Sequence, residues 1–339
     1  MYILGIESSC DETSAAVIEG DTRSLKSDIV ASQIEIHRLY GGVVPEIAGR
    51  AHIEAISRIS YRALDEAGLS LSDIGAVAVT AFPGLIGALL VGVNFAKSLA
   101  YANGIPLVAV NHVKAHTAAA YLTDPTLEPP FLAVVVSGGH TSIYEVRDYT
   151  DFCEIGATRD DAAGEAFDKI GRVIGMPYPG GAALDRAAQQ GDDGKYELPR
   201  SKPGSNPYDM SFSGLKTATL NLIHHAEQVG EAVDVNSLCA CFCRAVSETL
   251  VPRVEHALEE TGYRKIAVAG GVAANSRIRA DILAAAERIG AEVFMPPLSL
   301  CGDNAAMIGA QAFYEYQAGN MADMELNAYA TKSILGESL

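Results

Sequence analysis

Residues 131–148, FLAVVVSGGHTSIYEVRD, decide the fold of this chain. An apolar strand runs into a small polar turn, and a second strand leaves that turn. Residues 2–20, YILGIESSCDETSAAVIEG, repeat this order, with the polar turn at residues 10–13. Each copy begins a run of alternating helices and strands, and this repetition predicts two related α/β domains that face each other.

The segment between the two copies supplies most of the first domain. No charged residue lies between Asp73 and Lys97, but Pro83 and Gly84 break this apolar run. Because the break separates a β-rich piece from a helical piece, we expect a buried strand and a buried helix, not a membrane span. The elements expected here are a helix at 51–70, a strand at 74–81, a helix at 85–104, a strand at 106–111 and a helix that carries His112 and His116.

A stretch rich in proline and threonine, residues 123–130, is the expected junction between the domains. We therefore place an N-terminal domain at 1–128, a C-terminal domain at 129–325 and a tail at 326–339. The elements expected in the second half are helices at 244–262, 276–290 and 303–319, and a strand that enters a glycine turn at 265–275.

The chain is acidic, with a formal net charge of −17 over 339 residues. Hydrophobic residues make up 49% and charged residues 20%, as expected for a compact globular protein. The charge argues against binding nucleic acid by bulk electrostatics. An RNA partner would need local cationic patches or partner subunits.

None of the six cysteines forms a C-x-x-C pair, so no zinc ribbon or thioredoxin-like centre is expected, and we interpret them as reduced thiols. Cys239, Cys241 and Cys243 alternate in a stretch of helical character, where packing is the preferred explanation. The first residues lack the basic and then apolar pattern of a secretory signal. We therefore expect a cytoplasmic protein.

Glycine pairs stand at three turns: Gly138-Gly139, Gly180-Gly181 and Gly270-Gly271. One such pair usually makes only a tight turn, but three in a duplicated α/β frame favour phosphate binding by backbone amides. Neither G-x-x-x-x-G-K-[ST] nor G-x-G-x-x-G occurs. The arrangement that remains is the actin, sugar-kinase and heat-shock ATPase fold, an α/β fold with a nucleotide cleft between two related domains.

His112 and His116 lie on one face of the helix expected for them, as in the H-E-x-x-H motif of zinc peptidases. Position 113 is valine, so the glutamate that such peptidases use as general base is absent. Such a pair alone is more often a packed helix face than a metal site. Asp303, which follows a glycine and begins a helix, is the best third ligand, although a helix cap explains it equally well.

These motifs together resemble one family, the bacterial tRNA threonylcarbamoyladenosine transferases, or TsaD family, once labelled O-sialoglycoprotein endopeptidases. The resemblance extends over essentially the whole chain, and the motifs occur in the expected order. They are GIESSCDET, HIEAI, NHVKAH, VVSGGHT, GEAFDKIGR, YPGG, SFSGLKT, GGVAANSRIR and CGDNAAMIG.

The resemblance implies an acyl transfer to tRNA. The threonylcarbamoyl group of threonylcarbamoyl-AMP would pass to the exocyclic amine of the adenosine 3′ of the anticodon, in tRNAs that read codons beginning with A. The family acts in a complex, so the implied partners also include a degenerate paralogue of the same fold (TsaB-like) and a small P-loop ATPase (TsaE-like). Helix 54–67, which is apolar and weakly charged, is a candidate dimer surface.

The resemblance also implies roles for residues. One divalent metal ion, with Fe(2+) preferred and Zn(2+) as the alternative, would be held by His112, His116 and Asp303. Asp11 and Glu12, in the first polar turn, could orient the amine or take its proton, or could simply be turn residues. The residues implied to bind the adenylate are Val135, Val136, Ser137, Gly138 and Gly139 on the phosphate side, and Asp168, Gly181, Asp185 and Asn275 around the adenosine.

Three alternatives remain at this point. Lys216 could contact phosphate or RNA, or could be a solvated lysine. The chain could be an ATP-binding kinase or ATPase of the same fold, because a fold does not dictate chemistry. It could also be a non-catalytic scaffold subunit, although a scaffold should lack the metal ligands.

Overall fold

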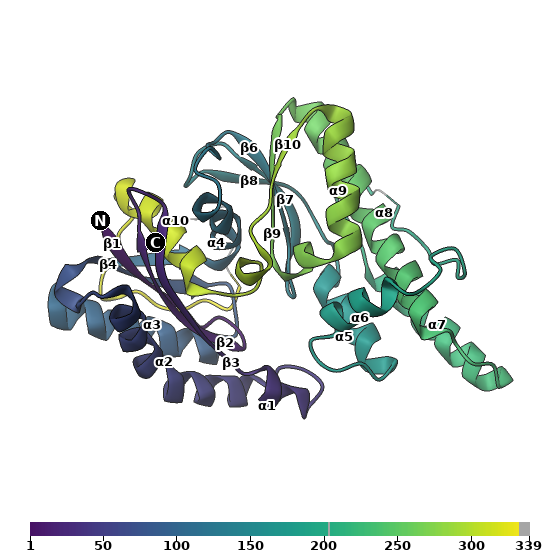
Figure 1. The fold of residues 1–339 in the computed structure, drawn as a ribbon, viewed down its shortest axis with the longest axis horizontal. Coiled ribbons are helices and arrows are strands. Elements are labelled where there is room, and N and C mark those ends of the chain that lie inside the picture. Colours follow the sequence, from purple (N-terminus) through teal and green to yellow (C-terminus); the bar gives the residue numbers. More distant parts are fainter. Residues whose placement is uncertain (203, 332–339) are drawn as a thin grey trace. The chain divides into compact units, whose positions relative to one another are not determined.

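The computed structural model describes residues 1–202 and 204–331, and it contains two compact units (Figure 1). Unit 1 combines Met1–Pro130, Val146–Cys153 and the described residues from Met295 onward. Unit 2 combines Phe131–Glu145 and Glu154–Phe294. Of the tail expected at 326–339, residues 332–339 lie outside the described residues, and the domain limits inferred from the sequence stay a prediction.

Each unit is built on one five-stranded sheet, and the two sheets have the same strand order. The order is β3-β2-β1-β4-β5 in unit 1, and β8-β7-β6-β9-β10 in unit 2. The repeat seen in the sequence therefore corresponds to a repeat of topology. The strands are β1 (Tyr2–Glu7), β2 (Glu12–Glu19), β3 (Ser24–Ser32), β4 (Ile74–Phe82), β5 (Leu107–Asn111), β6 (Phe131–Val136), β7 (Thr141–Val146), β8 (Phe152–Ala157), β9 (Lys265–Ala269) and β10 (Glu292–Phe294).

The helices of unit 1 include one that starts earlier than the sequence analysis expected. Helix α2 begins at Pro45 and not near residue 51, because Pro45 occupies the first helical position, where its missing N–H is not needed. It ends at Gly68, whose φ of 68° suits only glycine well. The helices are α1 (Ile34–Arg38), α2 (Pro45–Ala67), α3 (Ile86–Asn103), α4 (His112–Ala118) and α10 (Ala305–Gln317).

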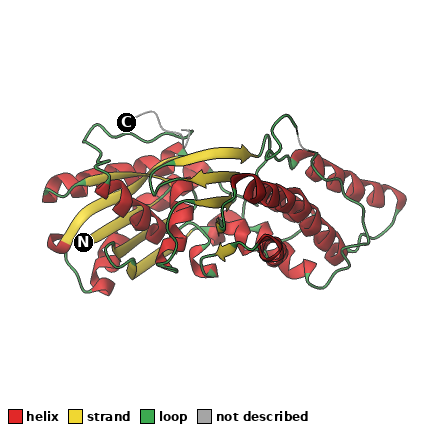
Figure 2. Cartoon of the chain, turned by 90° about the horizontal axis from the view of Figure 1, so that it is seen from above, coloured by secondary structure: helices red, strands yellow, loops and turns green. Residues whose placement is uncertain are grey.

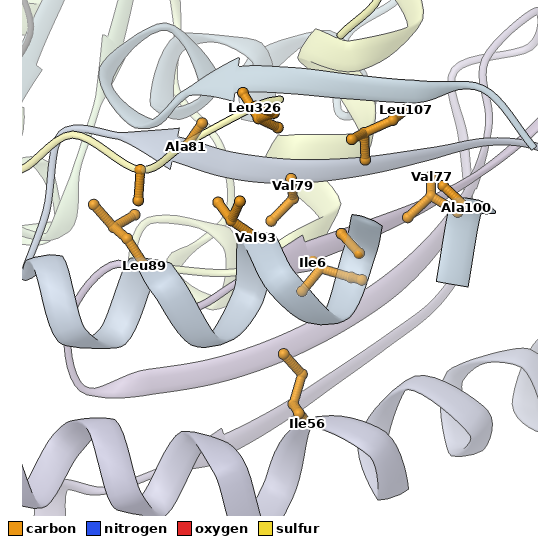
Figure 3. Close-up of a cluster of buried hydrophobic side chains, with 12 residues drawn as sticks. Ile6, Ile56, Val77, Val79, Ala81, Leu89, Val93, Ala100, Leu107 and Leu326 are labelled. Carbon is orange, nitrogen blue, oxygen red and sulfur yellow. The ribbon is translucent and has the colours of Figure 1, made fainter. Parts of the chain in front are cut away.

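Helices cover both faces of the sheet of unit 1 (Figure 2). Ile6 joins a buried cluster with Val79 of β4 and Val93 of α3, and Ile56 of α2 packs into the same cluster (Figure 3). Gly5 points to the opposite face, where α10 lies against it. Because side chains alternate along a strand, one face of β1 is directed toward α2 and α3, and the other packs against α10.

Unit 2 contains three helices that the sequence analysis did not assign: α5 (Ala163–Val173), α6 (Gly180–Ala188) and α7 (Ser213–Val229). Helix α8 (Val235–Thr261) is longer than the expected 244–262 and includes Cys239, Cys241 and Cys243, which are buried, as the packing explanation predicts. Helix α9 (Ser276–Ile289) follows a 3-10 turn after β9.

The apolar run after Asp73 forms β4 and α3, as expected from its break at Pro83. Within residues 1–202 and 204–331, no helix is both long enough and apolar enough to cross a membrane.

We predict that Gly5→Ala destabilises unit 1. A Cβ atom at position 5 would lie 2.4 Å from the Ala305 carbonyl oxygen, so α10 would have to move away from β1. Such overpacking costs about 1–3 kcal/mol, which should appear as a lower midpoint of urea unfolding. Gly87→Ala is the control, because outside its own helix and chain neighbours no atom of residues 1–202 and 204–331 lies within 4 Å of a Cβ there. Equal midpoints for Gly5→Ala and the wild type would contradict the prediction.

Candidate metal centre and glycine-rich loop

The two histidines are positioned by the start of α4, which follows β5 without a loop. The side chain of Asn111 caps this helix, accepting hydrogen bonds from the N–H groups of Val113 and Lys114 at 2.8 and 3.1 Å. His112 and His116 are 5% and 1% exposed, and their ring centroids lie 4.6 Å apart. The cap therefore fixes the first turn of a helix that buries both imidazoles side by side.

Asp303 reaches the histidines from the turn before α10. The cap of α10 is Asn304, whose side chain accepts a hydrogen bond from the Met307 N–H at 2.9 Å. Asp303 is thus not the cap, and its Oδ1 lies 3.4 Å from Nε2 of His112 and 3.4 Å from Nε2 of His116. The structure brings the three expected ligands together.

The three side chains fit a divalent metal ion. Two ligand atoms bound at about 2.0–2.1 Å with tetrahedral angles are about 3.3 Å apart, close to the two 3.4 Å separations found here. One ligand atom from each residue lies within 4.8 Å of the other two. In the described part of the chain, neither ring nitrogen of His116 has a hydrogen-bond partner, so an ion at Nε2 would satisfy a buried polar atom.

Burial and neighbouring charges shift the pKa values of the two histidines and of Asp303. Burial opposes the imidazolium form of His112, but the carboxylates of Asp303 and Glu7 raise its pKa well above the usual range. Burial lowers the pKa of His116. Although burial opposes it, the two histidines hold the pKa of Asp303 well below the usual range. An ion would therefore displace a proton from His112 on binding.

Asp11 and Glu12 lie where β1 turns into β2. Burial raises the pKa of Glu12 to about 7, while a hydrogen bond from Ser32 Oγ at 2.8 Å opposes the shift. The negative charges of Asp11 and Asp303 add to the increase. A carboxyl group with this pKa can donate or accept a proton near neutral pH.

His52, of the HIEAI motif, contacts the residues on either side of this turn. Its Nε2 lies 2.9 Å from the carbonyl oxygen of Cys10, which can only accept, so Nε2 carries the proton. Nδ1 then accepts a hydrogen bond from Thr13 Oγ1 at 2.7 Å. Burial lowers the pKa of His52, which favours this neutral form. The buried ring thereby holds the Cys10 carbonyl and the Thr13 side chain, which flank Asp11 and Glu12.

The glycine-rich loop of unit 2 follows β6. The Ser137 N–H donates to the His140 carbonyl at 2.7 Å, and the His140 N–H lies 3.2 Å from Ser137 Oγ. Between them Gly138 and Gly139 are exposed, and, apart from their chain neighbours, no atom of the described residues lies within 4 Å of where their Cβ atoms would be. This loop leaves room for a ligand against its backbone, whereas the side chains of Val135 and Val136 are buried and only their backbone could take part.

Two other glycines pack against the base of this loop. A Cβ at Gly164 would lie 2.5 Å from the Ser137 carbonyl oxygen, and one at Gly270 would lie 2.5 Å from the Val136 carbonyl oxygen. Gly270 also has a φ of 97°. Both positions therefore need glycine to keep the loop against α5 and the end of β9.

The four residues expected around the adenosine belong to α5, to α6 and to the cap of α9. Asp168 Oδ1 accepts the Gly180 N–H at 2.7 Å, and Gly181 is the second residue of α6. Asp185 Oδ1 accepts from Ser276 N and Oγ at 3.1 and 2.7 Å. Asn275 caps α9. These contacts join α5 to the start of α6 and α6 to the start of α9, and the ribose and adenosine roles stay predictions.

Comparison with known proteins supplies the family. A family model described as TsaD: tRNA N6-adenosine threonylcarbamoyltransferase matches residues 24–310. The chain belongs to this family. A relative with that name from Moorella thermoacetica is 51% identical over 326 residues, which are 96% of this chain and 95% of the relative. Another, from Geobacillus kaustophilus, is 49% identical and covers 97% of this chain and 95% of its own length.

Solved structures of distant proteins show the same fold. HypF from T. kodakarensis superposes with a TM-score of 0.63 at 14% identity, over 96% of this chain and 49% of HypF. Component A of (R)-2-hydroxyglutaryl-CoA dehydratase from Acidaminococcus fermentans gives 0.55 at 14% identity, over 94% and 99%. The actin, sugar-kinase and heat-shock ATPase fold predicted from the sequence is confirmed.

Two side chains of this TsaD-family chain make contacts that the sequence did not predict. Lys216 of SFSGLKT forms an ion pair with Asp161, so it is neither a solvated lysine nor an unpaired cation. Glu7, which the sequence analysis did not single out, lies 2.9 Å from Nδ1 of His112. Its position in an apolar strand gives no local signal, because its partners are distant in the sequence.

We predict that Glu12→Gln stabilises the protein more at pH 8 than at pH 5. A carboxyl whose pKa is raised in the folded state takes up a proton on folding between about pH 4.5 and 7, so its unfavourable contribution grows as pH rises through that window. The measurement is the urea midpoint of wild type and variant at both pH values. Glu35→Gln, on the surface of α1, is the control, and a difference that does not change with pH would refute the prediction.

Proposed function

We propose that this chain transfers the threonylcarbamoyl group of threonylcarbamoyl-AMP to N6 of the adenosine 3′ of the anticodon, in tRNAs that read codons beginning with A. Similarity over 96% of the chain to relatives named tRNA N6-adenosine threonylcarbamoyltransferase carries this proposal. In the reaction the amine attacks the carbamoyl carbon, the bond from that carbon to the phosphate oxygen breaks, and AMP leaves. The amine loses one proton.

His112, His116 and Asp303 would hold one divalent ion, Fe(2+) in preference to Zn(2+), with coordination positions left open. When bound, such an ion supplies Lewis acidity that polarises the carbamoyl carbonyl or offsets phosphate charge. Two nitrogen donors and one oxygen donor suit either metal. The convergence of these donors within 4.8 Å supports this assignment.

Glu12 is the best candidate to accept the proton of the attacking amine. Its pKa of about 7 leaves part of the population ionised at neutral pH, as a general base requires. Its Oε2 is buried and has no hydrogen-bond partner in the described residues. Asp11, its neighbour in the turn, would orient the amine.

The loop at Ser137–Gly139 would hold the phosphate of the adenylate. Its exposed glycines let backbone N–H groups approach an anion, and no side chain fills the space beside them. Asp168 and Asp185 would bind the ribose hydroxyls with their carboxylate oxygens. Gly181 and Asn275 would complete the adenosine pocket.

A kinase or ATPase of the same fold would also use such a loop. Magnesium, however, prefers oxygen ligands, and two of the three donors here are imidazoles. The transferase is therefore the better supported function, and a scaffold without chemistry would not need the three converging ligands.

We predict that His112→Ala and Asp303→Ala each lower tRNA modification at least 100-fold when the chain is combined with its partners, threonylcarbamoyl-AMP and unmodified tRNA. Each variant removes a metal ligand, so metal content should fall as well. His224→Ala, an exposed histidine of α7, is the matched control and should retain full activity. Full modification by both site variants would exclude the metal assignment, and no modification by the wild type would exclude the transferase.

We also propose that tRNA binding needs partner subunits, namely a TsaB-like paralogue and a TsaE-like P-loop ATPase. The net charge of −17 opposes binding of a polyanion by this chain alone. Helix α2 exposes Ile53 and Tyr61, at 65% and 51%, and such apolar side chains suit a protein partner. In a binding titration at physiological salt, the isolated chain should bind tRNA much more weakly than the assembled complex. Nanomolar binding by the isolated chain would contradict this.

A further inference from the structure

Glu7 is a carboxylate with no exposure to solvent, at the last position of β1. Its Oε2 accepts a hydrogen bond from Thr80 Oγ1 at 2.7 Å and lies 2.9 Å from His112 Nδ1. Its other oxygen accepts the N–H of Ser9. A buried carboxylate is costly unless it is fully hydrogen-bonded, and here donors from three separate segments surround it.

These contacts determine the tautomer of His112. An ionised carboxylate can only accept hydrogen bonds, so the proton that the ring keeps when an ion displaces the other is on Nδ1 and points at Glu7. Ser9 Oγ lies 3.2 Å from the same nitrogen and does not change this conclusion, since a hydroxyl can also accept. Nε2 is then left with its lone pair directed to the side of Asp303.

We infer that Glu7 is a positioning residue of the metal centre. Its contact with Nδ1 sets the ring orientation and the tautomer of His112, and makes His112 the stronger ligand of the two histidines. This inference rests on the metal site of the proposed function. A carboxylate behind a ligating histidine fixes its ring and raises its basicity. His116 lacks such support, because its Nδ1 has no hydrogen-bond partner in the described residues.

The register of the sheet explains why position 7 can do this. Side chains alternate along β1, so Glu7 points to the same face as Gly5, the face covered by α10. Thr80 lies beside it on β4, because Ile6 pairs with Val79 in the parallel register. Strand β1 thus packs against α10 and also carries the carboxylate that orients His112.

The experiment compares zinc affinity in the wild type, Glu7→Gln and Glu315→Gln, by competition with a chromophoric chelator. Glu315 is the matched control, a buried glutamate of unit 1 whose partners are Lys114, Gln311 and Asn320 and not a metal ligand. We expect Glu7→Gln to weaken zinc binding about 10- to 100-fold, the usual effect of losing such a carboxylate. Glu315→Gln should leave the affinity unchanged.

A second readout uses the wild type itself and does not depend on the variant folding. Long-range 1H–15N spectra of the zinc-loaded protein should show the proton of His112 on Nδ1, with Nε2 bound to metal. A proton on Nε2, equal affinities of Glu7→Gln and wild type, or equal weakening by Glu315→Gln would each overturn the inference. Failure of the wild type to bind zinc or iron would instead overturn the metal site of the proposed function.

Discussion

The close packing of α10 on β1 is the constraint on which the rest of unit 1 depends. Gly5 on the strand and Gly309 on the helix have no side chains, and a Cβ at either would overlap its neighbours, at 2.4 Å from Ala305 O and 2.9 Å from Ile18 Cγ1. The first helical N–H, that of Ala305, donates to Ser14 Oγ of β2 at 2.9 Å. These contacts therefore fix the position of the start of α10 against the sheet.

That fixed start decides where Asp303 lies. Asn304 caps the helix, so the residue before it must leave the helix axis, and its carboxylate comes to the two imidazoles of α4. The precision matters because a metal ion tolerates little error in ligand distance. The centre thus obtains its geometry from backbone packing between glycines, and its orientation from the side chains around it.

Local patterns were enough for much of this structure. The repeated strand and turn predicted the hairpins β1–β2 and β6–β7, and the Pro83-Gly84 break predicted β4 and α3, but β3, β8 and β10 were not expected. The start of α2 was missed, because the apolar periodicity begins after the residues that Pro45 brings into the helix. Asp303 was the best third ligand from the sequence alone, but a helix cap explained it equally well, and the family resemblance favoured the ligand. Glu7 had no signal, because its hydrogen-bond partners lie about 70 and 100 positions away and meet only in the folded sheet.

Unit 1 is built from segments that lie before and after most of unit 2 in the sequence, so its parts are synthesised at different times. Strand β1 and helix α4 emerge first, but Asp303 and α10 follow about 160 residues of unit 2. At ribosomal speeds of about 5–20 residues per second, the early part waits roughly ten to thirty seconds with one face of its sheet uncovered. A nascent chain lacks Asp303 throughout that time, so the proposed metal site is complete only after the start of α10 has been synthesised.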